Sequence, residues 1–220
     1  HKFRIVTKTP AFESTTITDE NGKQLLNAFK QSLNRLGQPS FEGLLIHRCN
    51  DLLRDKKDIL YRSLVKLKEE GLVKKIGVSA YDPEQVSKTI KRYDVDLVQI
   101  PLNVFDQRMY ESGTIDLLKN HKVEVHVRSI FLQGLLLMSK SEVPSYLNKI
   151  TKHMNALDEL LEKSGLSRIQ AAVTFIKFFP HVDCVIIGVN DEVQLASILK
   201  AFDYPPSNLN QKDFSQLTVH

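Results

Sequence analysis

Polar side chains stand at the ends of several predicted strands, and two of them are groups that act in acid–base chemistry. Lys8 lies near the end of the apolar run 3–9, and His47 ends the run 41–47. An ammonium and an imidazole can polarise a substrate oxygen or move a proton. The other polar residues at or near strand ends are Ser79, Gln99, Asn103 and Ser129. Barrel enzymes build their active sites at this rim from several strands, so we expect a shared site.

The elements that position these residues form six strand–helix units. The predicted strands cover 3–9, 41–47, 73–79, 96–103, 123–131 and 184–188. Helical periodicity follows each of them, with a capping start at Asp82-Pro83-Glu84 and stops at Gly37 and Gly71. Strict alternation of this kind implies a parallel sheet. The two architectures that fit are a doubly wound open sheet and a (β/α)8 barrel. Neither a G-x-G-x-x-G nor a G-x-x-x-x-G-K-[ST] turn is present, which disfavours the open nucleotide-binding sheet.

Composition excludes several classes of protein. With 42% hydrophobic and 25% charged residues in 220 positions, the chain has the balance of a globular protein. No Gly/Ser-rich or Pro-rich linker divides it, so we expect a single domain over 1–220. The net charge of +4 arises from lysines interleaved with acids, which predicts no nucleic-acid partner. The apolar stretch 130–138 is about half the length of a membrane span, so no membrane association is expected.

Cysteine and histidine usage adds two further expectations. Cys49 and Cys184 are far apart within apolar runs, which is typical of reduced thiols in a cytoplasmic protein. Cys49 follows His47 closely, but packing is the favoured interpretation over a nucleophilic role. The remaining histidines show no spacing of metal ligands, so no metal site is predicted.

Six phrases of the sequence resemble the aldo-keto reductases, in family order and at family-like spacing. They are Val6-Thr7-Lys8-Thr9, Leu44-Leu45-Ile46-His47-Arg48, Lys75-Ile76-Gly77-Val78-Ser79, Leu97-Val98-Gln99, Gly134-Leu135-Leu136 and Ile186-Ile187-Gly188-Val189. The resemblance implies a (β/α)8 TIM barrel of which this chain covers about strands three to eight. It also implies an oxidoreductase that transfers hydride between NAD(P)H and a carbonyl or alcohol substrate.

The family's catalytic group is an Asp, a Tyr, a Lys and a His, and this sequence matches two of them. Lys8 resembles the Lys, whose ammonium lowers the pKa of the Tyr, and His47 resembles the His, which orients the substrate oxygen. The Asp and Tyr belong to two strand–loop units upstream of the Lys strand, where this sequence begins. We therefore expect the biological polypeptide to be longer, with a degenerate gene as the alternative.

The resemblance also assigns cofactor-binding residues. Ser79 and Gln99 match residues that hold the nicotinamide carboxamide, whereas Ala80 stands where the family has an Asn. Arg128 and Ser129 lie in the predicted strand 123–131, where the family has an aromatic residue and a Ser, and Arg128 could stack on the nicotinamide. The residues expected to cradle the phosphates or contact the adenine are Gly134, Leu135, Gly188, Val189, Asn190 and Gln194. The acids Asp191 and Glu192 would repel a 2′-phosphate, so both NADP(H) and NAD(H) are predicted as cofactors.

Other interpretations of the same residues stay open. Gln99 could satisfy backbone groups inside the sheet, and Arg128 could pair with a carboxylate. One alternative function is a catalytically inactive cofactor-binding or regulatory barrel. Another is a different barrel enzyme in which Lys8 forms a Schiff base with a carbonyl substrate. The substrate depends on variable loops, for which 138–145 and 204–220 are the candidates, and the sequence predicts no oligomeric state.

Overall fold

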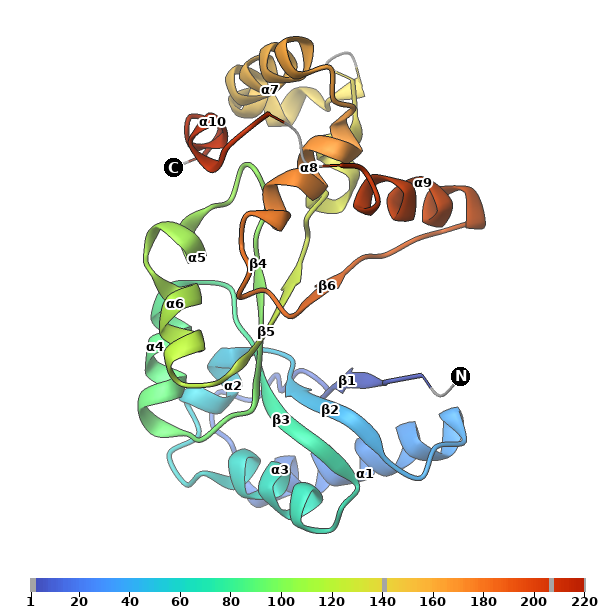
Figure 1. The fold of residues 1–220 in the computed structure, drawn as a ribbon. Coiled ribbons are helices and arrows are strands. Elements are labelled where there is room, and N and C mark those ends of the chain that lie inside the picture. Colours follow the sequence, from blue (N-terminus) through green and yellow to red (C-terminus); the bar gives the residue numbers. More distant parts are fainter. Residues whose placement is uncertain (1–2, 140–141, 206–207, 220) are drawn as a thin grey trace. The chain divides into compact units, whose positions relative to one another are not determined.

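The computed structural model describes residues 3–139, 142–205 and 208–219, in which six strands alternate with helices (Figure 1). The strands are β1 (Val6–Lys8), β2 (Phe41–Ile46), β3 (Val73–Ser79), β4 (Leu97–Pro101), β5 (Glu124–Arg128) and β6 (Cys184–Ile186). They form one sheet in chain order, and the pairs β1–β2, β2–β3, β3–β4 and β5–β6 are parallel. The predicted α/β alternation and parallel sheet are confirmed. Of the candidate substrate loops, residues 140–141, 206–207 and 220 lie outside the described residues.

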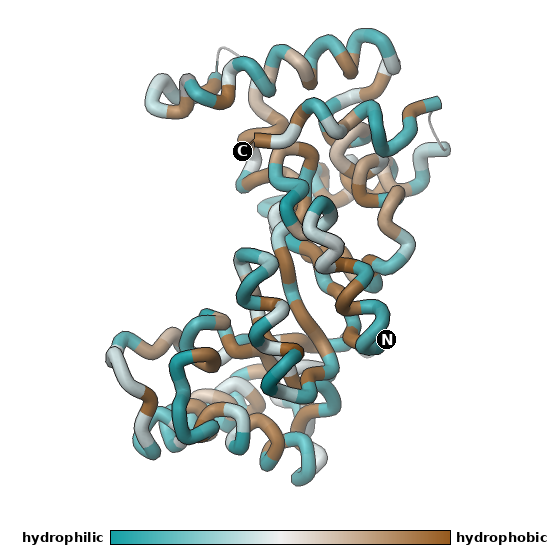
Figure 2. The backbone as a smooth tube through the Cα atoms, turned by 90° about the vertical axis from the view of Figure 1, so that its left-hand side faces the viewer, coloured by the Kyte–Doolittle hydropathy of each residue, from teal (hydrophilic) through white to brown (hydrophobic). Residues whose placement is uncertain are grey.

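The helices begin and end largely where capping residues predict. They are α1 (Asp19–Leu36), α2 (Cys49–Leu53), α3 (Ile59–Glu69), α4 (Pro83–Arg92), α5 (Arg108–Glu111), α6 (Thr114–Asn120), α7 (Thr151–Ser164), α8 (Arg168–Lys177), α9 (Glu192–Phe202) and α10 (Gln211–Ser215), with 3-10 segments η1 (Leu132–Leu137) and η3 (Ser145–Ile150). Gly37 ends α1 in the left-handed conformation, and Asp82 accepts a 2.8 Å hydrogen bond from the Gln85 amide at the start of α4. Figure 2 shows hydrophilic and hydrophobic residues alternating along these helices.

The chain divides into two compact units, each with its own core. Unit 1 comprises His1–Ile100 and Thr114–Val125, and unit 2 comprises Pro101–Gly113 and His126–His220. In unit 1, leucines of α3 and β2 are fully buried, and α1 packs against α3. Gly22 permits this approach because a Cβ there would lie 2.8 Å from Cγ2 of Ile59. Helix α3 in turn packs against β3.

An aromatic cluster forms the core of unit 2. Phe175 of α8 contacts Phe179 and Phe214, with ring centroids 5.0 and 5.4 Å apart. The buried Gln107 side chain donates a 2.7 Å hydrogen bond to the carbonyl of Phe214, and the Val219 amide donates to the carbonyl of Phe105 at 2.9 Å. These contacts fix α10 and the residues after it onto the segment that carries α5.

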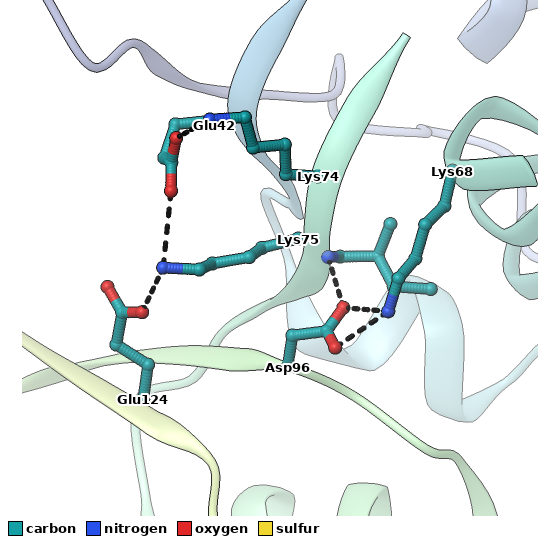
Figure 3. A network of polar contacts seen from close by, with 7 residues as sticks. Glu42, Lys68, Lys74, Lys75, Asp96 and Glu124 are labelled. Atoms are coloured by element: carbon teal, nitrogen blue, oxygen red, sulfur yellow. Dashed lines mark hydrogen bonds and ion pairs between the residues drawn. The ribbon is translucent and has the colours of Figure 1, made fainter. Parts of the chain in front are cut away.

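A charged network ties together the amino ends of strands in unit 1 (Figure 3). Lys75 of β3 bridges Glu42 at 3.3 Å and also pairs with Glu124. Nearby, Asp96 accepts a hydrogen bond from Lys68 at 2.6 Å and one from the Ile76 amide at 2.9 Å. The side chains of Lys75, Glu42 and Glu124 are only 28, 15 and 25% exposed. The network lies at the amino ends of these strands, whereas Lys8 and Ser79 lie at the carboxyl ends of β1 and β3.

Helix α9 of unit 2 is attached through little of its surface. Only Ile198 and Ala201 are buried in it, whereas Val193 and Leu199 are 70 and 55% exposed. The adjoining strand β6 has no buried residue. Among the residues that the structure describes, no helix has both the length and the apolar character that crossing a membrane requires.

Candidate functional site

The carboxyl edge of the sheet in unit 1 carries the predicted residues Lys8, His47 and Ser79. Lys8 and Ser79 are the last residues of β1 and β3, which flank β2, and His47 directly follows β2. The Lys8 Nζ donates a long hydrogen bond of 3.5 Å to the Ser79 Oγ. The structure therefore brings together a surface ammonium and a buried hydroxyl. The prediction that these strand ends share one edge is confirmed.

Gln99 lies beside Ser79 in the ladder between β3 and β4. The two residues are register partners, and the carbonyl of Gln99 accepts a 2.9 Å hydrogen bond from the amide of Ala80. Ser79 and Gln99 are 1 and 4% exposed. Register partners in a parallel ladder present their side chains on the same face of the sheet, so a hydroxyl and a carboxamide stand next to each other. Together they offer donors and acceptors to a ligand amide.

His47 is exposed, and its position is set through its backbone. Its amide donates a 3.2 Å hydrogen bond to the hydroxyl of Thr9, a residue that the sequence analysis did not single out. Thr9 is buried and directly follows Lys8. The imidazole thus stands at this edge on an anchored backbone and is accessible from solvent.

Unit 2 contains a cavity of about 630 Å³ between the segment that follows β5 and the segment that joins β6 to α9. Of the predicted cofactor-binding residues it is lined by Arg128, Ser129, Gly134, Gly188, Asn190 and Gln194. Leu135 instead lines a neighbouring hollow of about 400 Å³, to which Ser129 also contributes. Val189 is 41% exposed and lines neither space. The structure thus gathers six of these eight residues around one cavity.

A segment with unusual backbone angles lines this cavity, and side-chain hydrogen bonds hold it in place. Ser129, Gln133 and Gly134 have positive φ angles of 62, 55 and 92°, a conformation that is costly for the two residues other than glycine. Arg128 donates to the Ser129 hydroxyl at 3.3 Å, and Asn103 donates to the Ser129 carbonyl at 3.2 Å. Sparsely populated backbone conformations that surrounding contacts maintain are frequent at ligand sites.

The amino end of α9 forms another wall of the cavity. Asp191 caps the helix by accepting a 2.7 Å hydrogen bond from the amide of Gln194, and the Gln194 side chain accepts one of 3.0 Å from the amide of Asn190. The Asp191 carboxylate is therefore engaged with the helix and is not part of the lining. Val193 and Ser197 line the cavity although the sequence analysis missed them. The two residues are four positions apart on α9, shortly after the predicted phosphate loop, so helical spacing could have indicated them.

The cavity has the size and lining of a small-molecule binding site. Its volume lies within the range of small-molecule sites, and several of its lining residues are aliphatic. A helix amino end favours an anion, and Arg128 is the one cationic side chain among the described residues that line the space. Among the described residues no cluster of three or more metal-ligating side chains occurs.

Comparison with known proteins gives consistent matches. The model of the "Aldo/keto reductase family" matches residues 1–220. An uncharacterized oxidoreductase, YqkF, of Bacillus subtilis is 23% identical over 92% of this chain and 67% of its own length. L-glyceraldehyde 3-phosphate reductase of Escherichia coli K12 is 22% identical over 90% of this chain and 63% of its own length. The chain thus spans about two thirds of the length of these curated relatives.

Two solved structures share the fold. The holo form of aldo-keto reductase AKR11C1 from Bacillus halodurans superposes with a TM-score of 0.76 at 22% identity, covering 97% of this chain and 71% of that one. Glycerol dehydrogenase AKR11B4 from Gluconobacter oxydans gives a TM-score of 0.68 at 23% identity, covering 89 and 63%.

Proposed function

Because the chain belongs to the aldo/keto reductase family, we propose that the protein transfers hydride between a nicotinamide cofactor and a carbonyl or alcohol substrate. The observation that carries the proposal is the carboxyl edge of unit 1, where the Lys8 ammonium lies 3.5 Å from the buried hydroxyl of Ser79. The family's chemistry requires a cation and cofactor-holding groups at such an edge. We further propose that both units belong to one (β/α)8 domain, to which this chain contributes strands three to eight.

Each residue at the carboxyl edge has a separate task in this proposal. The ammonium of Lys8 favours the ionised form of a neighbouring proton donor and so lowers the pKa of that donor. The imidazole of His47 donates a hydrogen bond that orients the substrate oxygen. Ser79 and Gln99 hold the nicotinamide carboxamide, while Ala80 offers no side-chain amide and removes one such contact. The bound cofactor supplies the hydride.

The cavity of unit 2 is the proposed site for the rest of the cofactor. Gly134, Gly188 and Asn190, which line this cavity, provide backbone groups for the phosphates, and Gln194 contacts the adenine. Leu135 and Val189, which lie outside the lining, are not part of this proposal. Support comes from the helix amino end, which favours an anion, and from the segment around Ser129 with its positive φ angles, since residues of both line the cavity. Asp191 places a negative charge at the same helix end, so the proposal includes NAD(H) beside NADP(H).

Titration with NADPH and with NADH tests this function directly. The sequence has no Trp, so the fluorescence of the reduced cofactor can be followed without indole background. We expect saturable binding of at least one cofactor and weaker binding by Gln99→Leu. Glu20→Gln is a suitable control, because Glu20 lies on α1 with its side chain 79% exposed. The proposal would be refuted if neither NADPH nor NADH bound to the protein.

The same titration tests the contribution of Asp191. Asp191→Arg replaces an anion at the α9 amino end with a cation, so the affinity for NADPH should rise relative to that for NADH. Loss of the cap lowers helix stability by about 1 kcal/mol, and thermal unfolding of the variant measures this effect separately. An unchanged preference would show that the side chain is remote from the ribose.

A further inference from the structure

Thr9 joins the two strand ends that carry the proposed catalytic residues. Its amide donates a 2.9 Å hydrogen bond to the carbonyl of Leu45, which extends the β1–β2 ladder beyond Lys8. In a regular parallel ladder the next hydrogen bond would run from the amide of His47 to the carbonyl of Thr9. Here the hydroxyl of Thr9 accepts it instead, at 3.2 Å. Thr9 thus binds the His47 amide through its side chain. Through its own amide it pairs the end of β1, directly after Lys8, with β2.

A second anchor fixes the chain three residues later. The Phe12 amide donates to the buried carboxylate of Asp51 at 3.1 Å, and Arg54 donates to the carbonyl of Phe12 at 2.6 Å. Arg54 and Asp51 also pair at 2.8 Å. The segment after β1 therefore runs beside the segment after β2, and it stays attached at Phe12 when the Thr9 contact is removed. Loss of the Thr9 hydroxyl should act locally on His47.

We infer that Thr9 is a positioning residue. Its hydroxyl fixes the backbone of His47, so that the His47 imidazole reaches the substrate oxygen at the same edge as the Lys8 ammonium. The inference rests on the proposed function, because it takes the roles of Lys8 and His47 from there. It follows from two facts of the structure. Thr9 is only 5% exposed, and its hydroxyl accepts the 3.2 Å hydrogen bond from the His47 amide, so it acts on the backbone that carries the exposed imidazole.

The test compares Thr9→Val, which removes the hydroxyl at constant shape, with Thr9→Ser, which keeps it. Thr9→Val should lower kcat by about 10- to 100-fold, the effect of a displacement of about 1 Å in a catalytic group. The cofactor Kd should change less than about twofold, because Thr9 is not among the residues proposed to hold the nicotinamide and does not line the unit 2 cavity. Thr9→Ser should restore most of the rate. Thr7→Val, the same loss of a hydroxyl two residues earlier on β1, is the matched control and should leave kcat unchanged.

Amide hydrogen exchange measured by NMR gives a readout that does not depend on turnover. The His47 amide should exchange faster in Thr9→Val than in the wild type and at the wild-type rate in Thr9→Ser. If the wild type reduces no carbonyl, the proposed function fails, while this exchange pattern still decides whether Thr9 positions His47. Equal His47 exchange in all variants, or a kcat in Thr9→Ser as low as in Thr9→Val, would overturn the inference. Thr9→Ala provides a second hydroxyl-free variant in case Thr9→Val does not fold.

Discussion

Replacing Lys75 by Met tests the charged network at the amino ends of the strands. The substitution keeps most of the aliphatic stem and removes the ammonium, so Glu124 loses this partner and Glu42 keeps only its pair with Lys74 at 3.0 Å. Exposed ion pairs contribute about 0–1 kcal/mol, whereas breaking a buried pair costs about 3–5 kcal/mol. The three side chains are between 15 and 28% exposed, so we expect an intermediate loss of about 2–3 kcal/mol in the free energy of unfolding.

The pH dependence of this loss has a defined sign. Hydrogen bonds from Lys74 and Lys75 lower the pKa of Glu42 below its ordinary value of 4.5. A carboxyl group with a lowered pKa stabilises the fold above the unfolded-state pKa, and this contribution disappears as the pH falls through the folded-state value. Hydrogen bonds to Glu124 and Glu42 raise the pKa of Lys75 above 10.5, so its contribution persists through neutral pH and declines in stronger alkali. The difference between wild type and Lys75→Met should therefore be largest near neutrality and shrink below about pH 4.5.

Urea unfolding followed by far-ultraviolet circular dichroism measures this difference. Lys23→Met is the matched control, because Lys23 pairs with Glu20 at 3.4 Å while both side chains are at least 70% exposed. It should change the free energy of unfolding by less than about 0.5 kcal/mol. A double-mutant cycle of Lys75→Met with Glu124→Gln should give a coupling of about 1 kcal/mol or more. Equal losses in Lys75→Met and Lys23→Met, or a loss that does not depend on pH, would refute the reasoning.

Two further predictions concern Lys8 and the cysteines. Lys8→Met should lower kcat by at least about 100-fold while cofactor affinity stays within about twofold, since the ammonium acts on the proton donor. Steady-state kinetics measure kcat, and the fluorescence titration measures cofactor affinity. An equal loss of kcat and cofactor affinity would contradict the role assigned to Lys8. Cys49 should resist alkylation in the folded protein, because burial raises the pKa of its thiol to about 11. The partly exposed Cys184 should react first. Peptide mass mapping after iodoacetamide treatment measures the labelling of both. Faster labelling of Cys49 than of Cys184 would contradict this expectation.

The sequence predicts the long elements of the fold because their signals are local. The Asp82-Pro83 start of α4 and the left-handed Gly37 after α1 depend on nearby residues, and the structure confirms both. The short helices α2 and α10 escape prediction because they have too few residues to show a period. Phe214 of α10 is buried through contacts with residues more than a hundred positions away, such as Gln107. Such contacts leave no local pattern in the sequence.

Prediction of the candidate site has a similar limit. Lys8 and Ser79 end parallel strands, so the topology alone places them on one edge, and the structure confirms this. Thr9 was missed because its importance arises from one hydrogen bond to His47, which no periodicity encodes. The direction of the Asp191 side chain was equally hidden, since an Asp before a helix can cap it or face a ligand. Their roles in catalysis and cofactor binding stay predictions until the variants are measured.

The weak attachment of α9 links its local stability to ligand affinity. This helix contributes Val193, Gln194 and Ser197 to the cavity wall, yet it buries only Ile198 and Ala201. Segments with few buried apolar contacts open at a lower free energy than the rest of a fold. A ligand that contacts α9 binds only those molecules in which α9 is docked against the rest of unit 2. The free energy of docking α9 therefore reduces the observed affinity below the intrinsic affinity. A substitution that strengthens the docking of α9 would therefore tighten binding without touching the ligand.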